Sequence, residues 1–281
     1  MITGIKSYID TELNGGVNTW SFRKNPSQVT TQGLWFDLAL SPWNPVPKYW
    51  FGTPYQSTVV SQSLDGGFYH GYHTGQKYLA QTSMMATAAT ALPMTLTLMD
   101  YLMYYPLIDE GTTDEQFMIN NATLPRYPTG EGVQMMAVSV AWRTGGQSFF
   151  VNYTNQDGVA WRISGTVIQN TSSALWVVVT SATATNGNSC LFIPLQDGDT
   201  WVRSIESVTM LGTDVWLFSI VLVKPLTTSI IRGIDAPVEM TYILKQQMPE
   251  IKNDAFLNYV CLPNWALNAT WLLFEQKVIY T

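Results

Sequence analysis

Charged side chains are scarce in this sequence. Asp, Glu, Lys and Arg make up 12% of the 281 residues, which is about half of the usual share. Small polar residues and eleven tryptophans stand in their place. Because lysine and glutamate are depleted and aromatic residues enriched at protein–protein contacts, this composition predicts a chain whose surface is largely covered by neighbouring subunits.

Runs of basic residues are also missing, and Arg23-Lys24 is the densest basic spot. The net charge of −6 opposes binding to nucleic acid, which needs a basic face to neutralise phosphates. We therefore expect no nucleic-acid partner.

Cysteine is nearly absent. Cys190 and Cys261 lie far apart in the sequence and fit no metal-binding or redox motif. Two buried thiols are the favoured interpretation, and a single disulfide between them stays open as the alternative. This usage favours assembly in a reducing, intracellular compartment. The first residues, MITGIKSYIDTEL, contain no continuous apolar stretch, so we expect no secretory signal peptide.

One long apolar run, residues 84–108, has the length of a membrane span. Pro93, Asp100 and several threonines interrupt it, and no basic flank orients it, so we expect no membrane contact. A buried helix near residues 93–105 explains the run better, because Pro93 suits a first helical turn and Pro106 ends a helix.

The groups that carry most enzyme chemistry are few. His70 and His73 are the only histidines and lie in DGGFYHGYHTG, shortly after Asp65. A His-x-x-His pair on a helix can supply two metal ligands, but the surrounding glycines disfavour a helix, so a structural role is favoured. Neither histidine lies near a nucleophile motif of the Gly-x-Ser-x-Gly type.

Acidic residues cluster in residues 108–117 and 195–203. Neither spacing matches a calcium loop or the facing carboxylates of a glycosidase. The first cluster is typical of a helix start with Thr113 as its cap, and the second is typical of a turn. Glycine loops that hold phosphates are absent. We therefore predict no enzyme activity, no cofactor and no bound metal.

From Val133 onward, short alternating segments separated by turn residues predict a succession of strands. The clearest is SFFVNYTNQDGVAWRIS, residues 148–164, in which two alternating halves flank Asp157-Gly158, a typical hairpin turn. We expect its aromatic face to fill a core and its tip to lie at a rim. The spacing predicts a mainly β protein with residues 133–281 as a β-sandwich or jelly-roll-like body.

Residues 1–66 are predicted to be an extended N-terminal arm, and residues 67–132 a mixed segment that contains the helix near 93–105. Four prolines in residues 41–55 favour extended backbone without sheet pairing. Exposed rings in this segment are an aggregation hazard for a lone monomer, so we predict a subunit interface. Whether the chain's own body or a neighbour covers them stays open. The candidate interface residues are Trp43, Tyr49, Trp50, Phe51 and Tyr55.

Several segments resemble a family of tailed-bacteriophage virion proteins, and they follow one another in order along most of the chain. The resemblance implies a capsid-associated or other virion role and brings no catalytic residues with it. Trp161 and Trp201 depart from the family pattern, in which smaller residues are expected. The resembling segments are SQVTTQGLWFDLALSPWNPVPKYW, YPLIDEGTTDEQFMINNATLPRYPTGEGVQMMAVSV, SFFVNYTNQDGVAWR, FIPLQDGDTWVRSIESVTML and IVLVKPL.

Three functions compete. The first is a capsid auxiliary protein, of the cement or decoration type, that stabilises the head by contacting the major capsid protein or other virion subunits; symmetry favours a homo-oligomer, a trimer first. The second is a tail or baseplate component, including one that binds carbohydrate through exposed Trp and Tyr. An enzyme such as a glycan hydrolase ranks last, because no facing acid pair is evident. The expected location is the virion, assembled in the host cytoplasm.

Overall fold

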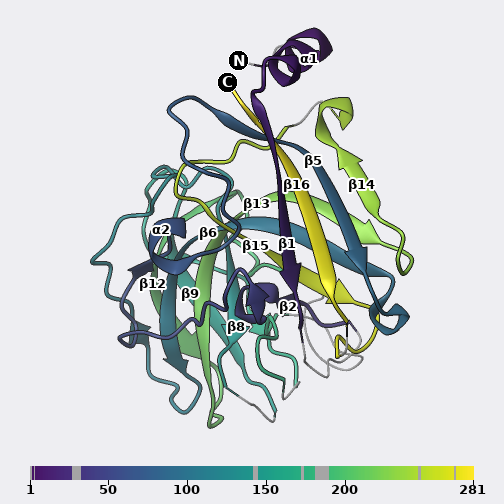
Figure 1. Cartoon of the computed structure of the whole chain (residues 1–281). Coiled ribbons are helices and arrows are strands. Elements are labelled where there is room, and N and C mark those ends of the chain that lie inside the picture. Colours follow the sequence, from purple (N-terminus) through teal and green to yellow (C-terminus); the bar gives the residue numbers. More distant parts are fainter. Residues whose placement is uncertain are drawn as a thin grey trace.

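The computed structural model describes residues 2, 4–26, 33–141, 145–171, 174–180, 190–245, 248–268 and 270–281. In this part of the chain the strands form three antiparallel sheets, which we call central, terminal and hairpin (Figure 1). The predicted mainly β, sandwich-like fold is confirmed. Within the same residues no helix is both long and apolar enough to cross a membrane. The helical elements are α1 (Ile5–Leu13), α2 (Gln62–Asp65) and the 3-10 turns η1 (Leu38–Leu40), η2 (Ala89–Ala91) and η3 (Tyr242–Lys245).

The central sheet consists of β2 (Phe36–Asp37), β4 (Thr58–Val59), β6 (Met94–Asp109), β8 (Gln134–Ser139), β13 (Leu217–Ile231) and β15 (Phe256–Pro263). Its order is β2-β15-β6-β13-β8, with β4 also on β6. The two longest strands, β6 and β13, pair along their whole length, from Met94 opposite Ile231 to Asp109 opposite Leu217. This pair of strands forms the centre of the central sheet.

The terminal sheet consists of β1 (Val17–Lys24), β3 (Trp43–Asn44), β5 (Lys77–Ala86), β14 (Val238–Thr241) and β16 (Leu272–Tyr280), in the order β14-β5-β16-β1-β3. The first and last strands of the chain, purple and yellow in Figure 1, pair from Val17 opposite Ile279 to Lys24 opposite Leu272. Both ends of the chain are therefore held in one sheet.

The hairpin sheet consists of β7 (Gln116–Phe117), β9 (Ser148–Asn155), β10 (Arg162–Ile163), β11 (Val167–Ile168) and β12 (Val202–Met210). Its order is β10-β9-β12-β7, with β11 also on β9. As predicted, Phe149, Val151 and Tyr153 of β9 fill a core. Trp161 and Ile163 are exposed instead, because β10 is an edge strand that pairs with β9 only at two positions.

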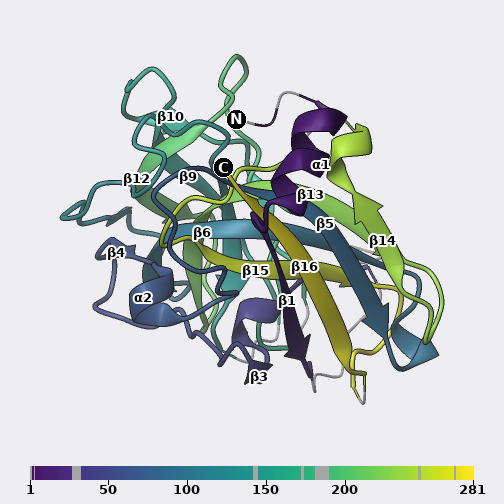
Figure 2. The same ribbon diagram turned by 45° about the horizontal axis from the view of Figure 1, so that its top comes forward.

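One face of the central sheet packs against both other sheets. Residues 94–98 of β6 contribute to the core beneath the terminal sheet, and residues 102–108 contribute to the core beneath the hairpin sheet. Figure 2 shows β6 and β15 crossing beneath β1 and β16. The opposite face is covered by residues 39–60, including the fully buried Trp50. The fold is thus two β-sandwiches that share one sheet.

The prediction of a helix near residues 93–105 is wrong, because this segment lies in strand β6. Nearly every residue of β6 is buried, since cores lie on both faces of the central sheet. A continuous apolar run is typical of such a strand and cannot be separated from a buried helix by periodicity alone. Pro106 is tolerated because it lies where the register with β13 shifts, between Tyr105 and Ile108.

The N-terminal segment differs from the predicted extended arm. In its described part β1 lies inside the terminal sheet between β3 and β16, and β2 pairs with β15 with Asp37 opposite Val260. Only α1 projects from the body (Figure 1). Residues 33–66 therefore belong to the same packed unit as the described residues of the segment 133–281.

Candidate binding surfaces

The five aromatic residues predicted to form an interface divide into two groups. Trp43, Tyr49 and Phe51 are 57%, 47% and 52% exposed, whereas Trp50 is fully buried and Tyr55 is half-buried. The chain's own body therefore covers Trp50, and the prediction that Trp50 belongs to an exposed contact is wrong. The three exposed rings stay candidates for contact with another subunit.

Trp50 anchors this segment to the core. Its ring stacks on Tyr101 with centroids 5.3 Å apart, and its Nε1 donates a hydrogen bond to Asp37 Oδ2 at 2.7 Å. Asp37 Oδ1 accepts from the Tyr101 hydroxyl at 2.6 Å and from the Ala39 amide at 2.9 Å. Burial raises the pKa of Asp37 to about 6, although these hydrogen bonds and the charge of Lys24 oppose that change.

Further bonds fix the backbone on both sides of Trp50. Lys24 Nζ donates to the carbonyls of Ser41 and Pro45 at 2.9 Å and 2.7 Å. The Tyr104 hydroxyl donates to the Phe51 carbonyl at 2.8 Å. Lys48 and Asp65 form an ion pair of 2.6 Å. Because backbone and anchor are both fixed, little chain entropy is left to lose at the exposed rings if they are covered by another molecule.

The exposed rings form two small platforms. Tyr49 and Phe51 flank Trp50 and stack on one another, with centroids 6.1 Å apart and planes inclined by 13°. Trp43 meets Trp271 edge to face at 5.0 Å. Trp43 has a φ of 100°, a conformation that is costly for a residue with a side chain and that often marks a functional position.

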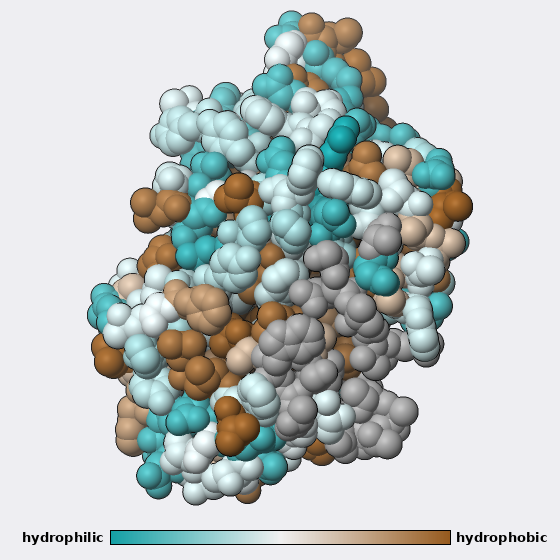
Figure 3. Space-filling model, turned by 60° about the horizontal axis from the view of Figure 1, so that its bottom comes forward, coloured by the Kyte–Doolittle hydropathy of each residue, from teal (hydrophilic) through white to brown (hydrophobic). Residues whose placement is uncertain are grey.

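Hydrophobic side chains elsewhere on the surface lie in separate groups. Figure 3 shows one face on which hydrophobic residues, in brown, lie among hydrophilic ones, in teal and white. Phe117 and Trp161, at opposite edges of the hairpin sheet, meet edge to face at 6.3 Å and are both exposed. These two rings therefore form an exposed aromatic pair outside the N-terminal segment.

Helix α1 carries an apolar stripe that the sequence interpretation missed. Ile5, Ile9 and Leu13 are all exposed, and their spacing of four places them along one face of the helix. The spacing is visible in the sequence, but a helix of 9 residues gives a weak signal, and the breaks that follow it favour an extended arm. A salt bridge from Lys277 of β16 to Glu12 fixes its C-terminal end at 2.5 Å.

The two histidines have separate structural partners. His70 is buried, and its Nε2 lies 2.6 Å from Gln276 Oε1, so Nε2 carries the proton when the ring is neutral. Burial lowers the pKa of His70 to about 4, although the bond to Gln276 opposes this. His73 packs edge to face on Tyr280 at 5.2 Å. This arrangement agrees with the structural role predicted for both residues.

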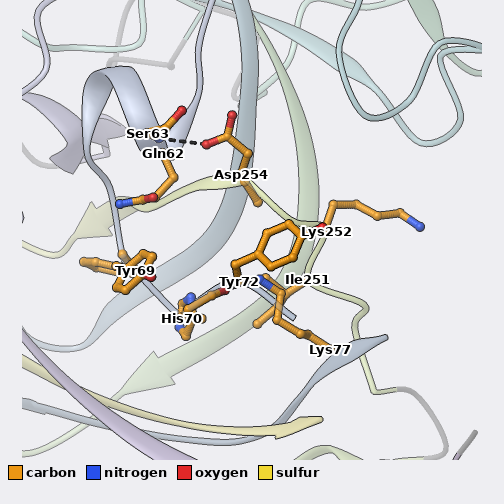
Figure 4. A pocket seen from close by; sticks show the side chains of 12 residues that line it. Gln62, Ser63, Tyr69, His70, Tyr72, Lys77, Ile251, Lys252 and Asp254 are labelled. Carbon is orange, nitrogen blue, oxygen red and sulfur yellow. Dashed lines mark hydrogen bonds between the residues drawn. The ribbon is translucent and has the colours of Figure 1, made fainter. Parts of the chain in front are cut away.

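A cavity of about 370 Å³ opens between α2, the loop that carries the histidines and the loop before β15. Figure 4 shows Lys77, Asp254 and the rings of Tyr69 and Tyr72 around it. A second hollow of about 650 Å³ shares Tyr69, Gly71 and Tyr72 with the first. The combination of aromatic walls with a few charged groups is typical of small-molecule sites.

The acidic clusters have structural roles. Residues 108–117 contain the end of β6, a turn and β7 instead of the predicted helix start, because Asp109 Oδ1 accepts from the Gly111 amide and so closes a turn. In the second cluster Asp199 forms an ion pair with Arg162 at 2.9 Å and accepts from the Tyr153 hydroxyl at 2.6 Å. This cluster is the predicted turn, and it ties the hairpin together.

Cys190 and Cys261 are both free thiols, and Cys261 is buried. Among the residues with described positions, no group of three or more His, Cys, Asp or Glu could hold a metal ion. Comparisons with protein-family models, with curated proteins and with solved structures find no match to this chain.

Proposed function

We propose that this chain is a structural protein of a tailed-bacteriophage particle, and first of all a capsid auxiliary protein of the cement or decoration type. Its partners are the major capsid protein or other virion subunits. The single observation that carries the proposal is the Tyr49–Phe51 platform, two exposed rings on backbone that the buried Trp50 holds in place.

The physical argument is that exposed aromatic area on rigid backbone is suited to association. Burying an aromatic side chain contributes on the order of 1.5–3 kcal/mol, and half of each ring in this platform is still exposed. Lysine-poor, tryptophan-rich composition supports the same role, because such residues concentrate at contact surfaces. The sequence resemblance to virion proteins supplies the kind of particle.

The distribution of patches favours a bridging position. Trp43, the Tyr49–Phe51 platform, the α1 stripe and the Phe117–Trp161 edge are separate exposed groups. A protein at the joints between capsomers contacts several neighbours at once, and closed symmetry favours a homo-oligomer such as a trimer. The alternative, a tail or baseplate component, needs the same kind of contacts in far fewer copies.

The copy number in purified particles tests the proposal. Quantitative mass spectrometry against isotope-labelled peptides of this chain and of the major capsid protein gives the ratio directly. A ratio near one copy, or a simple fraction of one, per capsid subunit supports the head position. A ratio of a few copies per particle supports the tail alternative, and absence from particles contradicts both.

A further inference from the structure

Lys77 is an unusual feature of the cavity between α2 and the histidine loop. Its side chain is buried, with 4% of the residue exposed, and it lines the cavity. Its Nζ donates to the Gly71 carbonyl at 2.7 Å. An ammonium group has three protons, and among the described residues no other partner for them is found. A buried cation with unused hydrogen-bond donors is costly, so the Lys77 ammonium favours an acceptor from outside the chain.

Asp254 supplies the complementary acceptor on the same cavity. One carboxylate oxygen, Oδ1, accepts from the Ser63 amide at 2.7 Å, as the dashed line in Figure 4 shows. Within the described residues its second oxygen has no hydrogen-bond donor. Lys252, which also lines the cavity, is already paired with Glu250 at 2.7 Å. The positive charge of Lys77 and the negative charge of Asp254 therefore balance one another. A ligand that satisfies both has hydroxyl groups, which donate and accept, and no net charge.

Aromatic rings form the walls around these polar groups. Tyr72 is 75% exposed, and Tyr69 is close to half exposed. Tyr69 meets Trp20 edge to face at 5.7 Å, and Trp20 lines the adjoining hollow together with Tyr280. Rings of this kind offer apolar faces beside polar tips, which fits a molecule with an apolar face and a rim of hydroxyl groups.

We propose that this cavity binds a neutral pyranose unit of a saccharide. The C–H face of the sugar lies against Tyr72, while its hydroxyl groups accept from Lys77 Nζ and donate to Asp254 Oδ2. The adjoining hollow past Tyr69 receives the next sugar of a chain. This inference does not rest on the structural role in the virion, because none of its residues belongs to the Trp43 or Tyr49–Phe51 platforms.

Titration of the full-length protein with sugars tests the site. The probes are glucose, galactose, mannose and N-acetylglucosamine, with glucuronate as the charged comparison. Calorimetry and saturation-transfer NMR measure the binding of each sugar. We expect saturable binding of at least one neutral sugar with a Kd of about 1 mM, which roughly 50 mM sugar saturates. We expect weaker binding of glucuronate, because the balanced charges of Lys77 and Asp254 offer its carboxylate no net attraction to offset the cost of removing it from water.

Three variants assign the binding to this cavity. Tyr72→Ala removes an exposed ring, Lys77→Met removes the ammonium, and Asp254→Asn removes the charge but keeps an oxygen for the Ser63 amide. Each is expected to weaken sugar binding about tenfold or more. Tyr49→Ala, an equally simple loss of an exposed tyrosine elsewhere, is expected to leave the affinity unchanged.

Any one of three results overturns the proposal. It fails if no neutral sugar binds saturably, if glucuronate binds as well as the neutral sugars, or if Tyr72→Ala and Asp254→Asn bind like the unaltered protein. Tyr72 and Asp254 are exposed, so these two variants are expected to fold. They therefore test the sugar site even if Lys77→Met does not fold. Tyr72→Ala is expected to enter particles at normal copy number, which separates this test from that of the virion role.

Discussion

The indole Nε1 of Trp50 donates a hydrogen bond to Asp37 Oδ2 at 2.7 Å, and this bond joins the proline-rich segment to strand β2 in the interior. Both partners are buried. The residues on either side of Trp50, Tyr49 and Phe51, consequently face outward on a fixed backbone. One buried pair therefore sets the geometry of the proposed contact surface.

Trp50→Phe is expected to destabilise the protein by about 2 kcal/mol, because Asp37 loses a donor to a buried, charged oxygen. Trp50→Ala is expected to cost about 3–5 kcal/mol, since it also leaves a cavity. Urea unfolding followed by circular dichroism gives both values. Trp43→Ala, a change of an exposed tryptophan, serves as control and is expected to change stability by less than about 1 kcal/mol. Equal effects of Trp43→Ala and Trp50→Ala contradict this assignment.

The double change Tyr49→Ser with Phe51→Ser is expected to weaken binding to particles without unfolding the chain. About half of each ring is left to bury, so the loss is about 1–1.5 kcal/mol for each ring, or roughly a hundredfold in affinity for the pair. Binding of purified protein to particles that lack it, measured by co-sedimentation, gives the affinity.

The matched control for that experiment is Tyr72→Ser, which removes an exposed tyrosine outside the platform. It is expected to bind particles normally. If the double variant binds as tightly as Tyr72→Ser, the platform is not a contact surface.

Arg126→Ala is expected to destabilise the protein by about 3–5 kcal/mol, because it leaves the buried carboxylate of Asp100 without its cation. Arg126 holds both oxygens of Asp100, with Nε at 3.0 Å and a terminal nitrogen at 2.8 Å. Burial raises the pKa of Asp100 to about 6 even with Arg126 present. The free energy of unfolding in urea at pH 7 measures the effect.

Removal of an exposed ion pair gives the contrast. Lys6→Ala breaks the pair with Asp10 on the surface of α1, and a change of at most about 0.5 kcal/mol is expected there. A similarly small effect of Arg126→Ala shows that water reaches Asp100.

The hairpin is expected to lose stability in acid through Asp199. Partial burial raises the pKa of this group, but hydrogen bonds from Arg162, Tyr153 and Asn155 outweigh it and bring the pKa down to about 2. A lowered pKa in the folded state means that the stabilisation is complete above about pH 4, the ordinary value. It is lost as the pH falls from about 4 to about 2.

Asp199→Asn removes this titration. Unfolding free energies measured between pH 2 and pH 6 are therefore expected to fall less steeply with acid in the variant than in the unaltered protein. Asp157→Asn, a change of an exposed acid at the hairpin tip, is the control for the loss of one negative charge. Parallel pH profiles for all three proteins contradict the role of Asp199.

The mainly β character and the position of the hairpin could be predicted from local sequence patterns. Alternating residues on both sides of Asp157-Gly158 are a local signal, and Gly158 has the positive φ of 77° that such a turn requires. The burial of Phe149, Val151 and Tyr153 followed from the same alternation. Local patterns succeed where one face of a strand is buried and the other is not.

Long-range contacts, and not the local sequence, determine which of the adjacent rings at positions 49–51 is buried. Proline-rich backbone has no regular period, so nothing local separates Trp50 from its neighbours; the acceptor on Asp37 and the ring of Tyr101 do so from distant parts of the chain. The same holds for β6, which is apolar throughout because it lies between two cores. Likewise the cavity at Lys77 and Asp254 joins residues 177 positions apart in the sequence. Contacts over such separations depend on strand pairing across the whole fold, which local sequence patterns do not encode.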